Sequence, residues 1–380
     1  MEFSILKNDF LKGLSKVQSL VNRKTAFPIT LNVLLTAGND GVVISATDME
    51  SAFVGSYPAS VAAPGTVTVP GRKLFEIVKD FPDESVTLRE TDGGWVKIAG
   101  EKLDYRLMAM SADEFPALPD VDRTGLFSLP GDLCLDILEK ADLPSPGTGE
   151  DKRPHLVHLL GFFMEKVEEE GKPPLLRLVA TDGHRLARVD FEPGEPGALS
   201  SLGLEKGAIL PKRAAADMAR ISEGGGNVEL GIRGGYFIFS RENETLIGRL
   251  LDGEYPDYRV VIPKDVEASI TVERTSFQAL LKRVSIFTSE NFKAVSFKLD
   301  ASSLTLSIKN PEIGEFVEEF PVSYDGEPFE TAFNPRYFIE AINVMQSIKI
   351  KVLLEKGKRA CLVSGDEDPG YLMVIMPMRA

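Results

Sequence analysis

The sequence predicts an α+β protein made of three copies of one β-rich domain, each about 125 residues long and each with two helices. Most apolar segments are short, alternate with polar residues and are flanked by Gly, Asp or Asn, which is typical of strands and hairpins. Two kinds of amphipathic helix recur in the same order. The markers shared by the copies are similarly spaced, and a repeat of this length indicates the architecture more firmly than any single motif.

The predicted strands lie in the segments VTVPG, VTLRETDGGWVKIAG, NVELGIRGGYFIFS and SLTLSIKN. Asp92-Gly93-Gly94 and Gly234-Gly235 each separate two alternating runs. Tight hairpin turns need a positive φ, which glycine adopts without a steric penalty. These two glycine-containing segments therefore predict hairpin turns.

The first kind of helix begins each copy. In NDFLKGLSKVQSLV, apolar residues recur at helical spacing after Asn8, the candidate N-cap. The apolar face consists of Phe10, Leu11, Leu14, Val17 and Leu20. PGDLCLDILEKADL and TSFQALLKRVSIF repeat the pattern, and each follows a strand-like stretch.

The second kind of helix always follows a proline, in VPGRKLFEIVKDF, LPKRAAADMARIS and NPRYFIEAINVM. Proline is tolerated in the first helical turn, where its missing N–H is not needed. Pro70, Pro211 and Pro335 lie 141 and 124 residues apart. The extra length of the middle copy falls in two loop-like insertions, LPSPGTGEDKRPH and EPGEPGALSSLGLEKG. The predicted domains are residues 1–125, 126–258 and 259–380.

Composition limits the function classes. With 43% apolar and 26% charged residues, the chain has the composition of a soluble globular protein. Its first residues lack a signal-peptide pattern, and no apolar run is long enough to span a bilayer. Cys134 and Cys361 are isolated, as expected of small buried residues in a cytoplasmic protein. The net charge of −14 disfavours nonspecific nucleic-acid binding by the surface as a whole, but it allows a local basic surface.

The segment VATDGHRLA places His184 between an Asp-Gly pair and Arg185. The sequence contains no P-loop, G-x-S-x-G, H-E-x-x-H or C-x-x-C pattern. The commonest signatures of nucleotide-binding proteins, serine hydrolases, zinc proteases and redox proteins are therefore absent. A metal-assisted hydrolase using His155, His158 and His184 is the alternative. If the stretch around the first two is a strand, however, residues 155 and 158 point to opposite faces, which rules out joint ligation. We therefore expect no metal, no cofactor and no catalytic residue, and a turn at Asp182-Gly183 on which a partner peptide could dock.

Three motifs then resemble one family. VATDGHRLA (179–187), YPDYRVVIP (255–263) and VIMPMRA (374–380) are similar to segments of the bacterial replicative sliding clamp, the β subunit of DNA polymerase III holoenzyme. TVPGRKLFEI (68–77) and NFKAVSFKL (291–299) extend the resemblance over essentially the whole chain. The resemblance implies that each domain packs two helices against antiparallel sheets. It also implies that two protomers close head to tail into a six-domain ring around double-stranded DNA, without sequence preference or catalytic activity.

The resemblance further implies a hydrophobic pocket for a Gln-led peptide that ends in Leu and Phe. The replicative DNA polymerase, the clamp loader and other clamp-binding proteins carry such a peptide. The matching positions are Leu159, Thr181, Gly183, His184, Arg185, Leu186, Pro256, Val260, Val261, Phe292, Asn334, Tyr337, Val374, Met376, Pro377, Met378 and Arg379. Val260 stands where family members can have an arginine, and Val157 and His158 stand where tyrosines can precede Leu159.

For DNA, the resemblance points to Lys24, Arg72 and Lys73. For the dimer interface it points to Lys73, Tyr105 and Leu107 on one side and to Ile286 and Phe287 on the other. Basic charge is concentrated in the helical segments, with net charges of +4 in residues 3–24 and +3 in both 206–220 and 274–293. Residues 132–142 carry −3 instead, so we expect that helix to repel DNA.

Overall fold

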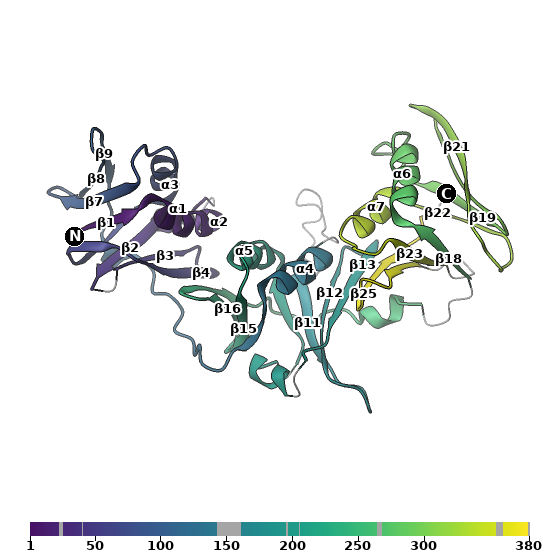
Figure 1. Cartoon of the computed structure of the whole chain (residues 1–380), viewed down its shortest axis with the longest axis horizontal. Coiled ribbons are helices and arrows are strands. Elements are labelled where there is room, and N and C mark those ends of the chain that lie inside the picture. Colours follow the sequence, from purple (N-terminus) through teal and green to yellow (C-terminus); the bar gives the residue numbers. More distant parts are fainter. Residues whose placement is uncertain are drawn as a thin grey trace. The chain divides into compact units, whose positions relative to one another are not determined.

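The computed structural model of the chain describes residues 1–22, 26–39, 41–142, 161–194, 197–204, 206–263, 268–354 and 360–378 (Figure 1). The predicted repeat is confirmed. Each copy runs strand, helix, three strands, strand, helix, three strands, and the first copy adds one short strand, β5.

The bounds of the elements follow this repeat. The first copy contains β1 (Glu2–Leu6), α1 (Lys7–Lys16), α2 (Gln18–Val21), η1 (Pro28–Leu31), β2 (Asn32–Gly38), β3 (Gly41–Thr47), β4 (Ser51–Tyr57), β5 (Ser60–Ala63), β6 (Gly65–Pro70), α3 (Gly71–Lys79), β7 (Ser85–Thr91), β8 (Trp95–Ala99), β9 (Asp104–Met108) and η2 (Ala112–Glu114). The middle copy contains β10 (Phe127–Pro130), α4 (Gly131–Ala141), β11 (Gly161–Val167), β12 (Leu175–Thr181), β13 (Arg185–Phe191), η4 (Ala198–Leu202), β14 (Ala208–Pro211), α5 (Lys212–Ser222), β15 (Asn227–Arg233), β16 (Tyr236–Arg241), β17 (Glu244–Arg249) and η5 (Tyr258–Val261). The third contains β18 (Ala268–Glu273), α6 (Arg274–Ser285), β19 (Val295–Asp300), β20 (Ser303–Asn310), β21 (Gly314–Pro321), β22 (Phe329–Phe333), α7 (Pro335–Asn343), β23 (Lys349–Leu354), β24 (Cys361–Gly365) and β25 (Tyr371–Ile375).

Both predicted hairpin turns are present. Gly93 and Gly94 join β7 to β8 with φ of 79° and 76°, and Gly234 and Gly235 join β15 to β16 with φ of 55° and 83°. These are left-handed conformations that side chains other than hydrogen disfavour.

Three predicted helix starts are wrong in detail. Leu6, and not Asn8, is the N-cap of α1, because β1 runs directly into the helix. Pro70 and Pro211 are the last residues of β6 and β14, and only Pro335 occupies the first turn of a helix. At the first two sites proline ends the strand ladder, to which it cannot donate a hydrogen bond.

The chain divides into two compact units, and the middle copy contributes to both. The first unit is Met1–Leu135, Ser200–Leu204 and Arg213–Leu250, and the second is Asp136–Leu199, Glu205–Lys212 and Leu251–Ala380. In the first unit, an eight-stranded sheet joins two copies through β17 and β4, where Leu246 faces Phe53. Its strand order is β10-β15-β16-β17-β4-β3-β2-β6.

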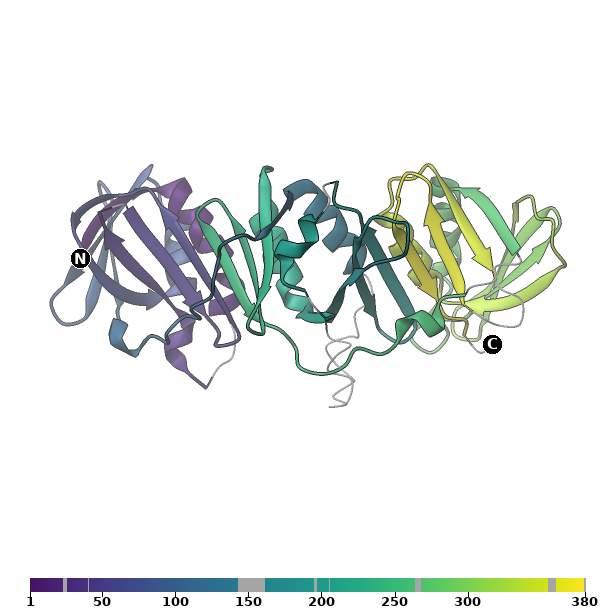
Figure 2. The same ribbon diagram turned by 90° about the horizontal axis from the view of Figure 1, so that it is seen from below.

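The second unit repeats this construction. Its eight-stranded sheet has the order β14-β11-β12-β13-β25-β24-β23-β18, and β13 pairs with β25 so that Leu186 faces Val374 (Figure 1). Figure 2 shows the C-terminal strands of this sheet, drawn in yellow, side by side. The two smaller sheets have the orders β5-β1-β7-β8-β9 and β21-β20-β19-β22.

The core lies between the helices and the sheets. α1 packs beside α3, and α6 beside α7. Phe10 and Leu14 of α1 are fully buried, as the predicted apolar face requires, and so are Phe277 of α6 and Phe338 of α7. Cys134 and Cys361 are free thiols and buried, as predicted, and burial raises the pKa of Cys134 to about 11. Within the described residues no helix is long and apolar enough to cross a membrane.

Candidate functional site

The segment around His184 is a tight turn between β12 and β13. The Oδ1 atom of Asp182 accepts hydrogen bonds from the backbone N–H groups of His184 (2.9 Å) and Arg185 (3.0 Å). The hydroxyl of Thr181 donates to the carbonyl of Arg185 (2.7 Å), and Gly183 has φ of 84°. The turn is thus held by its own polar side chains, and the side chain of His184 remains exposed.

The C-terminal segment closes one side of this turn. β25 ends at Ile375, before Pro377, as the missing N–H of proline predicts. The backbone of the residues that follow is held by hydrogen bonds to two other segments. Met376 donates an N–H to the carbonyl of His184 (2.9 Å), and Met378 donates to the carbonyl of Ala332 (2.8 Å). The tail therefore connects the β12–β13 turn to β22.

A buried apolar cluster lies beneath this surface. It contains Leu186 and Val374 from the two joined strands and Tyr258 from η5, and Tyr255 and Met376 pack against it. The ring of Tyr255 stacks on Phe163 of β11 at a centroid distance of 4.9 Å. Its members lie on or beside β12, β13, η5, β24 and β25, which lie far apart in the sequence, so the cluster exists only in the folded state.

A polar network fixes the linker that precedes the third copy. Arg177 forms two hydrogen bonds with Asp190 (2.6 and 2.8 Å) and donates a third to the hydroxyl of Tyr258 (3.2 Å). That hydroxyl donates to Glu165, which also accepts from Arg259 (2.7 Å). Burial, followed by the hydrogen bond to Glu165, raises the pKa of Tyr258. The network ties η5 to β11–β13 and leaves the adjacent Pro256, Val260 and Val261 exposed.

The third copy contributes the start of α7. Asn334 is buried and caps the helix by accepting a hydrogen bond from the N–H of Arg336 (3.1 Å). Asn334 is therefore a helix cap as well as a candidate peptide contact. Three residues later, the ring of Tyr337 lies 4.5 Å from the guanidinium carbon of Arg185.

The structure brings many predicted peptide-contact residues together in the second unit, where Arg185, Leu186, Asn334 and Val374 are buried and the others are at least partly exposed. The turn, the strand joint, the tail and α7 supply Thr181, Gly183, His184, Arg185, Leu186, Asn334, Tyr337, Val374, Met376 and Met378, which are linked through the contacts above. Phe292 is exposed after α6 and is not part of the buried cluster. Leu159 and Arg379 lie outside the described residues. Glu340, which also contacts Arg185, was not predicted, because no local pattern pairs residues 155 positions apart.

The predicted DNA contacts lie on α3. Arg72 and Lys73 are exposed, and both pair with Glu76, at 3.0 and 2.7 Å. Exposed pairs one helical turn apart contribute little because solvent screens them, so phosphate can displace them. Lys24 lies outside the described residues.

The charges of the other helices differ from what their sequence totals predict. Lys140 of α4 is buried against Asp136 (2.8 Å) and Asp368 (2.9 Å), while Asp132 and Glu139 are exposed. The fully exposed charges of α4, those of Asp132 and Glu139, are therefore both negative.

The basic segments are partly neutralised too. In α5, Lys212 pairs with Asp142 (3.2 Å), Arg213 with Asp48 (3.6 Å) and Arg220 with Asp217 (2.7 Å). Lys16 of α1 is buried and donates to the carbonyl of Arg220, and burial lowers its pKa. A count of charges along the sequence thus overstates the basic charge that these helices offer to DNA.

Four of the five predicted dimer residues lie on or beside the edge strands of two sheets, and the fifth, Lys73, lies on α3. Tyr105 and Leu107 belong to β9, the edge strand of the five-stranded sheet of the first unit. Ile286 and Phe287 follow α6, and the ring of Phe287 packs on Phe316 of β21 at 5.5 Å. β21 is the edge strand of the four-stranded sheet in the second unit.

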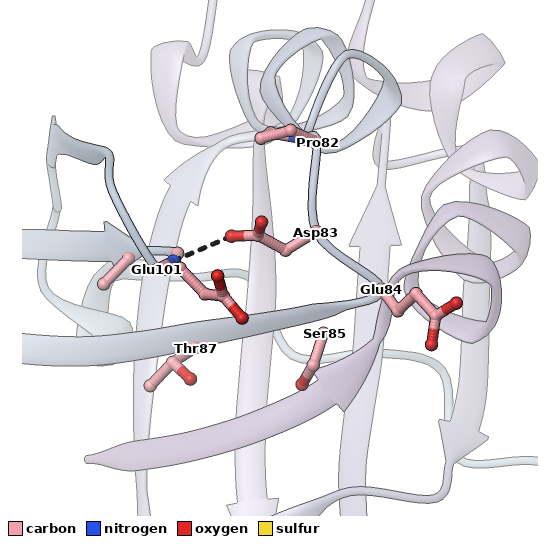
Figure 3. A pocket seen from close by; sticks show the side chains of 8 residues that line it. Pro82, Asp83, Glu84, Ser85, Thr87 and Glu101 are labelled. Carbon is pink, nitrogen blue, oxygen red and sulfur yellow. Dashed lines mark hydrogen bonds between the residues drawn. The ribbon is translucent and has the colours of Figure 1, made fainter.

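A separate cavity of about 700 Å³ lies at the start of β7 and the end of β8 (Figure 3). Its lining includes the side chains of Asp83, Glu84 and Glu101, and the carboxylate of Asp83 accepts a hydrogen bond from the N–H of Glu101 (2.8 Å). These carboxylates come without a histidine or cysteine in the lining. The lining gives no acid–base or nucleophilic pair that would indicate catalysis.

Comparison with known proteins identifies the family. Three family models match, described as the N-terminal, central and C-terminal domains of the DNA polymerase III beta subunit, at residues 1–119, 150–257 and 259–379. The chain is 31% identical to a curated beta sliding clamp of Caulobacter vibrioides, and the match covers 100% of both chains. The chain belongs to the bacterial beta sliding clamp family.

Solved structures of family members have the same fold. The DNA polymerase sliding clamp of Caulobacter crescentus superimposes with a TM-score of 0.90 at 30% identity over 100% of both chains. The sliding clamp of Bartonella birtlesii, solved bound to griselimycin, superimposes with a TM-score of 0.91 at 27% identity, again over 100% of both. The resemblance predicted from the three motifs is therefore confirmed.

For a sliding clamp, the alternative of a histidine metal site has no support. Two of its three histidines, His155 and His158, lie outside the described residues. In the part of the chain that the structure describes, no three His, Cys, Asp or Glu side chains are placed to hold a metal ion together. The surface around His184 instead combines backbone hydrogen bonds from the tail, ion pairs of Arg185 and the apolar side chains of Met376 and Met378, which suit a peptide.

Proposed function

We propose that this protein is a DNA sliding clamp, which encircles duplex DNA and tethers the replicative polymerase and other DNA-processing proteins to it. The observation that carries the proposal is the match of three clamp domains along the full chain. A clamp acts by topology and performs no chemical step, so we assign no catalytic residue and no cofactor. It would work in the cytoplasm, with domains at residues 1–125, 126–258 and 259–380.

Encirclement accounts for the acidic composition of the chain. A protein with a net charge of −14 binds DNA poorly from solution, because long-range repulsion opposes the encounter. A closed ring does not need tight binding, and it slides best when no side chain is locked in a groove. Contacts from Arg72, Lys73 and Lys24 would be directed to phosphates and indifferent to base sequence.

Closure requires two protomers in a head-to-tail arrangement, a heterologous contact that closes after two copies. The edge strands β9 and β21 support it, because each presents an unpaired row of backbone groups. Arg106 on β9 is exposed and opposite in charge to Glu315 and Glu319 on β21, while Asp104 of β9 pairs with Lys97. Tyr105 and Ile286 would add the apolar anchors of the interface.

The partner proteins would bind through the surface around the β12–β13 turn. A Gln-led peptide that ends in Leu and Phe needs apolar contacts for its two anchors and polar groups for its backbone. Met376 and Met378 can adapt to different apolar side chains, and Val260, Val261 and Phe292 are exposed apolar residues of the same unit. His184 would supply a contact at the edge.

Loading onto DNA tests the central claim. The clamp would be loaded by a clamp loader and ATP onto a nicked circular plasmid, and retention measured by gel filtration. Linearising the plasmid should release the clamp from the DNA ends, whereas an uncut plasmid should retain it. Equal retention on the linear and circular forms would contradict encirclement, and metal-dependent hydrolysis of a model ester by the protein alone would favour the hydrolase alternative.

A further inference from the structure

Arg185 is enclosed on three sides. Its Nε atom pairs with Oδ2 of Asp182 (3.2 Å), its Nη1 atom pairs with Glu340, and its guanidinium lies over the ring of Tyr337 at 4.5 Å. Only 7% of the side chain is exposed. The cation is therefore shielded from solvent and is already paired with two carboxylates.

These contacts join two parts of the second unit. Asp182 and Arg185 belong to the β12–β13 turn of the middle copy, whereas Tyr337 and Glu340 lie on α7 of the third. Because the two α7 residues are three positions apart, they share one face of the helix. The two backbone hydrogen bonds of the tail, from Met376 to His184 and from Met378 to Ala332, connect the same two parts.

We propose that Arg185 is a positioning residue and that its ion pair with Glu340 gives it this role. Together they hold the β12–β13 turn against α7 and thereby set the affinity for partner peptides. This inference rests on the proposed function of the same surface. It differs from a role as a direct peptide ligand, in which Arg185 would offer its N–H groups to the incoming chain.

The physical argument is one of preorganisation. A peptide that binds a turn already in its final position does not lose affinity to the ordering of that turn. Arg185 supplies this order, since a planar guanidinium can pair with carboxylates at its edge and stack on a ring with its face. As a direct ligand it would first have to give up Glu340.

Glu340 is the appropriate residue to change. Its side chain is 43% exposed, so replacing it leaves no buried charge other than that of Arg185, which keeps Asp182. Asp182 is unsuitable, because it also accepts the backbone N–H groups of His184 and Arg185 and its loss would unfold the turn. Glu340→Gln keeps the shape of the side chain and removes only its charge.

The test compares peptide binding by the full-length wild type and Glu340→Gln, using a fluorescent Gln-led Leu/Phe peptide and anisotropy. We expect affinity to fall on the order of threefold to tenfold, as for loss of one charged positioning contact. In the double variant with Arg185→Lys, the two losses should not add, because both act through one interaction. If Arg185 binds the peptide directly, releasing it from Glu340 should leave affinity unchanged or raise it, and that result would overturn the inference.

Asp300→Asn is the matched control. Asp300 pairs with Lys298 (3.4 Å) on β19 of the same unit. It lies at the far end of β19 from Val295, and Val295 pairs with Phe333 beside α7. Its replacement should leave peptide affinity at the wild-type value.

A second readout needs no peptide. Hydrogen exchange of the Met376 N–H, which donates to His184, should be faster in Glu340→Gln than in the wild type, because the turn is less firmly held. If the wild type binds no peptide but exchange still increases, the proposed function fails while the positioning role remains. Unchanged exchange together with unchanged affinity would overturn the positioning role itself.

Discussion

The backbone N–H of Met376 donates a 2.9 Å hydrogen bond to the carbonyl of His184. This bond places the C-terminal tail directly against the turn that the motif VATDGHRLA forms. The tail is therefore part of the structure of the candidate peptide surface as well as a source of apolar contacts, and this double role determines how the surface should respond to truncation and substitution.

Deletion of residues 376–380 should abolish binding of a Gln-led Leu/Phe peptide. The deletion removes the two methionines and both backbone hydrogen bonds that hold the tail to His184 and Ala332, and apolar anchors of this kind contribute about 2 kcal/mol or more each. Calorimetric titration with the peptide measures the loss. Dimerisation and retention on circular DNA should be unaffected.

The shorter deletion of residues 379–380 separates the two contributions, because it removes only the predicted contact Arg379 and keeps Met376, Met378 and both hydrogen bonds. It should retain most of the affinity. Unchanged peptide affinity after the longer deletion would show that the surface has been assigned to the wrong part of the molecule.

Substitution of His184 by alanine should weaken the peptide only modestly, by about threefold or less, as for a rim contact. The bond from Met376 uses the carbonyl of His184, which alanine also has, and the imidazole is exposed at the edge of the surface. The same titration measures the effect. A loss of a hundredfold or more would indicate that the imidazole itself binds the peptide.

Replacement of both Ile286 and Phe287 by alanine should convert the dimer into monomers. Ile286 is 70% exposed in the single protomer, and burial of such a side chain on association is worth about 1.5–3 kcal/mol. Sedimentation at micromolar concentration measures the result. Ile348→Ala is the control, since Ile348 is 67% exposed but accepts a hydrogen bond from Arg274, at the opposite end of α6 from Ile286. A wild type that is already monomeric under these conditions would refute the dimer.

Charge reversal at Arg72 should weaken retention on DNA. It should also make the plot of log affinity against log salt concentration less steep by about one unit, the expected contribution of one phosphate contact. Lys172→Glu is a matched control, because the two side chains are about equally exposed and each pairs with a nearby glutamate. Retention on circular DNA is measured as a function of salt. A strong preference of the wild type for one base sequence would contradict phosphate-directed contact.

Substitution of Lys140 by methionine should destabilise the second unit by about 3 kcal/mol in urea unfolding, since it leaves the buried carboxylate of Asp368 without its cation. The loss should lie at the lower end of the usual range, because Asp368 keeps hydrogen bonds from Gln346 and Ser347. Asp136→Asn should cost far less, because Asp136 is partly exposed. Equal losses in the two variants would contradict a special role of the buried pair.

The ion pair between Lys140 and Asp368 also predicts that the folded protein loses stability in acid. Burial opposes ionisation of Asp368, but hydrogen bonds from Ser347, Gln346 and Lys140 prevail and hold its pKa below the usual value. A lowered folded-state pKa adds stability above the unfolded value of about 3.9 and loses it as the pH falls through the folded value. Unfolding in urea should therefore become easier below about pH 4, and less steeply so in the Lys140→Met variant.

Much of the fold could be predicted from the sequence because its signals are local. Alternating runs around Gly93-Gly94 and Gly234-Gly235 indicate hairpins, and the face of Phe10 and Leu14 indicates a helix packed on a sheet, since strand and helix periods are properties of neighbouring residues. Their recurrence indicated the three copies, and VATDGHRLA together with the C-terminal segment indicated the family and the region of the candidate site.

Tertiary structure alone decided which charges remain available and which residues support the site. The sequence counts Lys140 and Lys16 among the cations of their helices, but both are buried, and Arg185 pairs with Glu340, 155 residues away. A charged side chain has no local pattern that names its partner. The partner depends on which strands join, here β13 with β25, and long-range pairing of strands brings together residues that the sequence keeps apart.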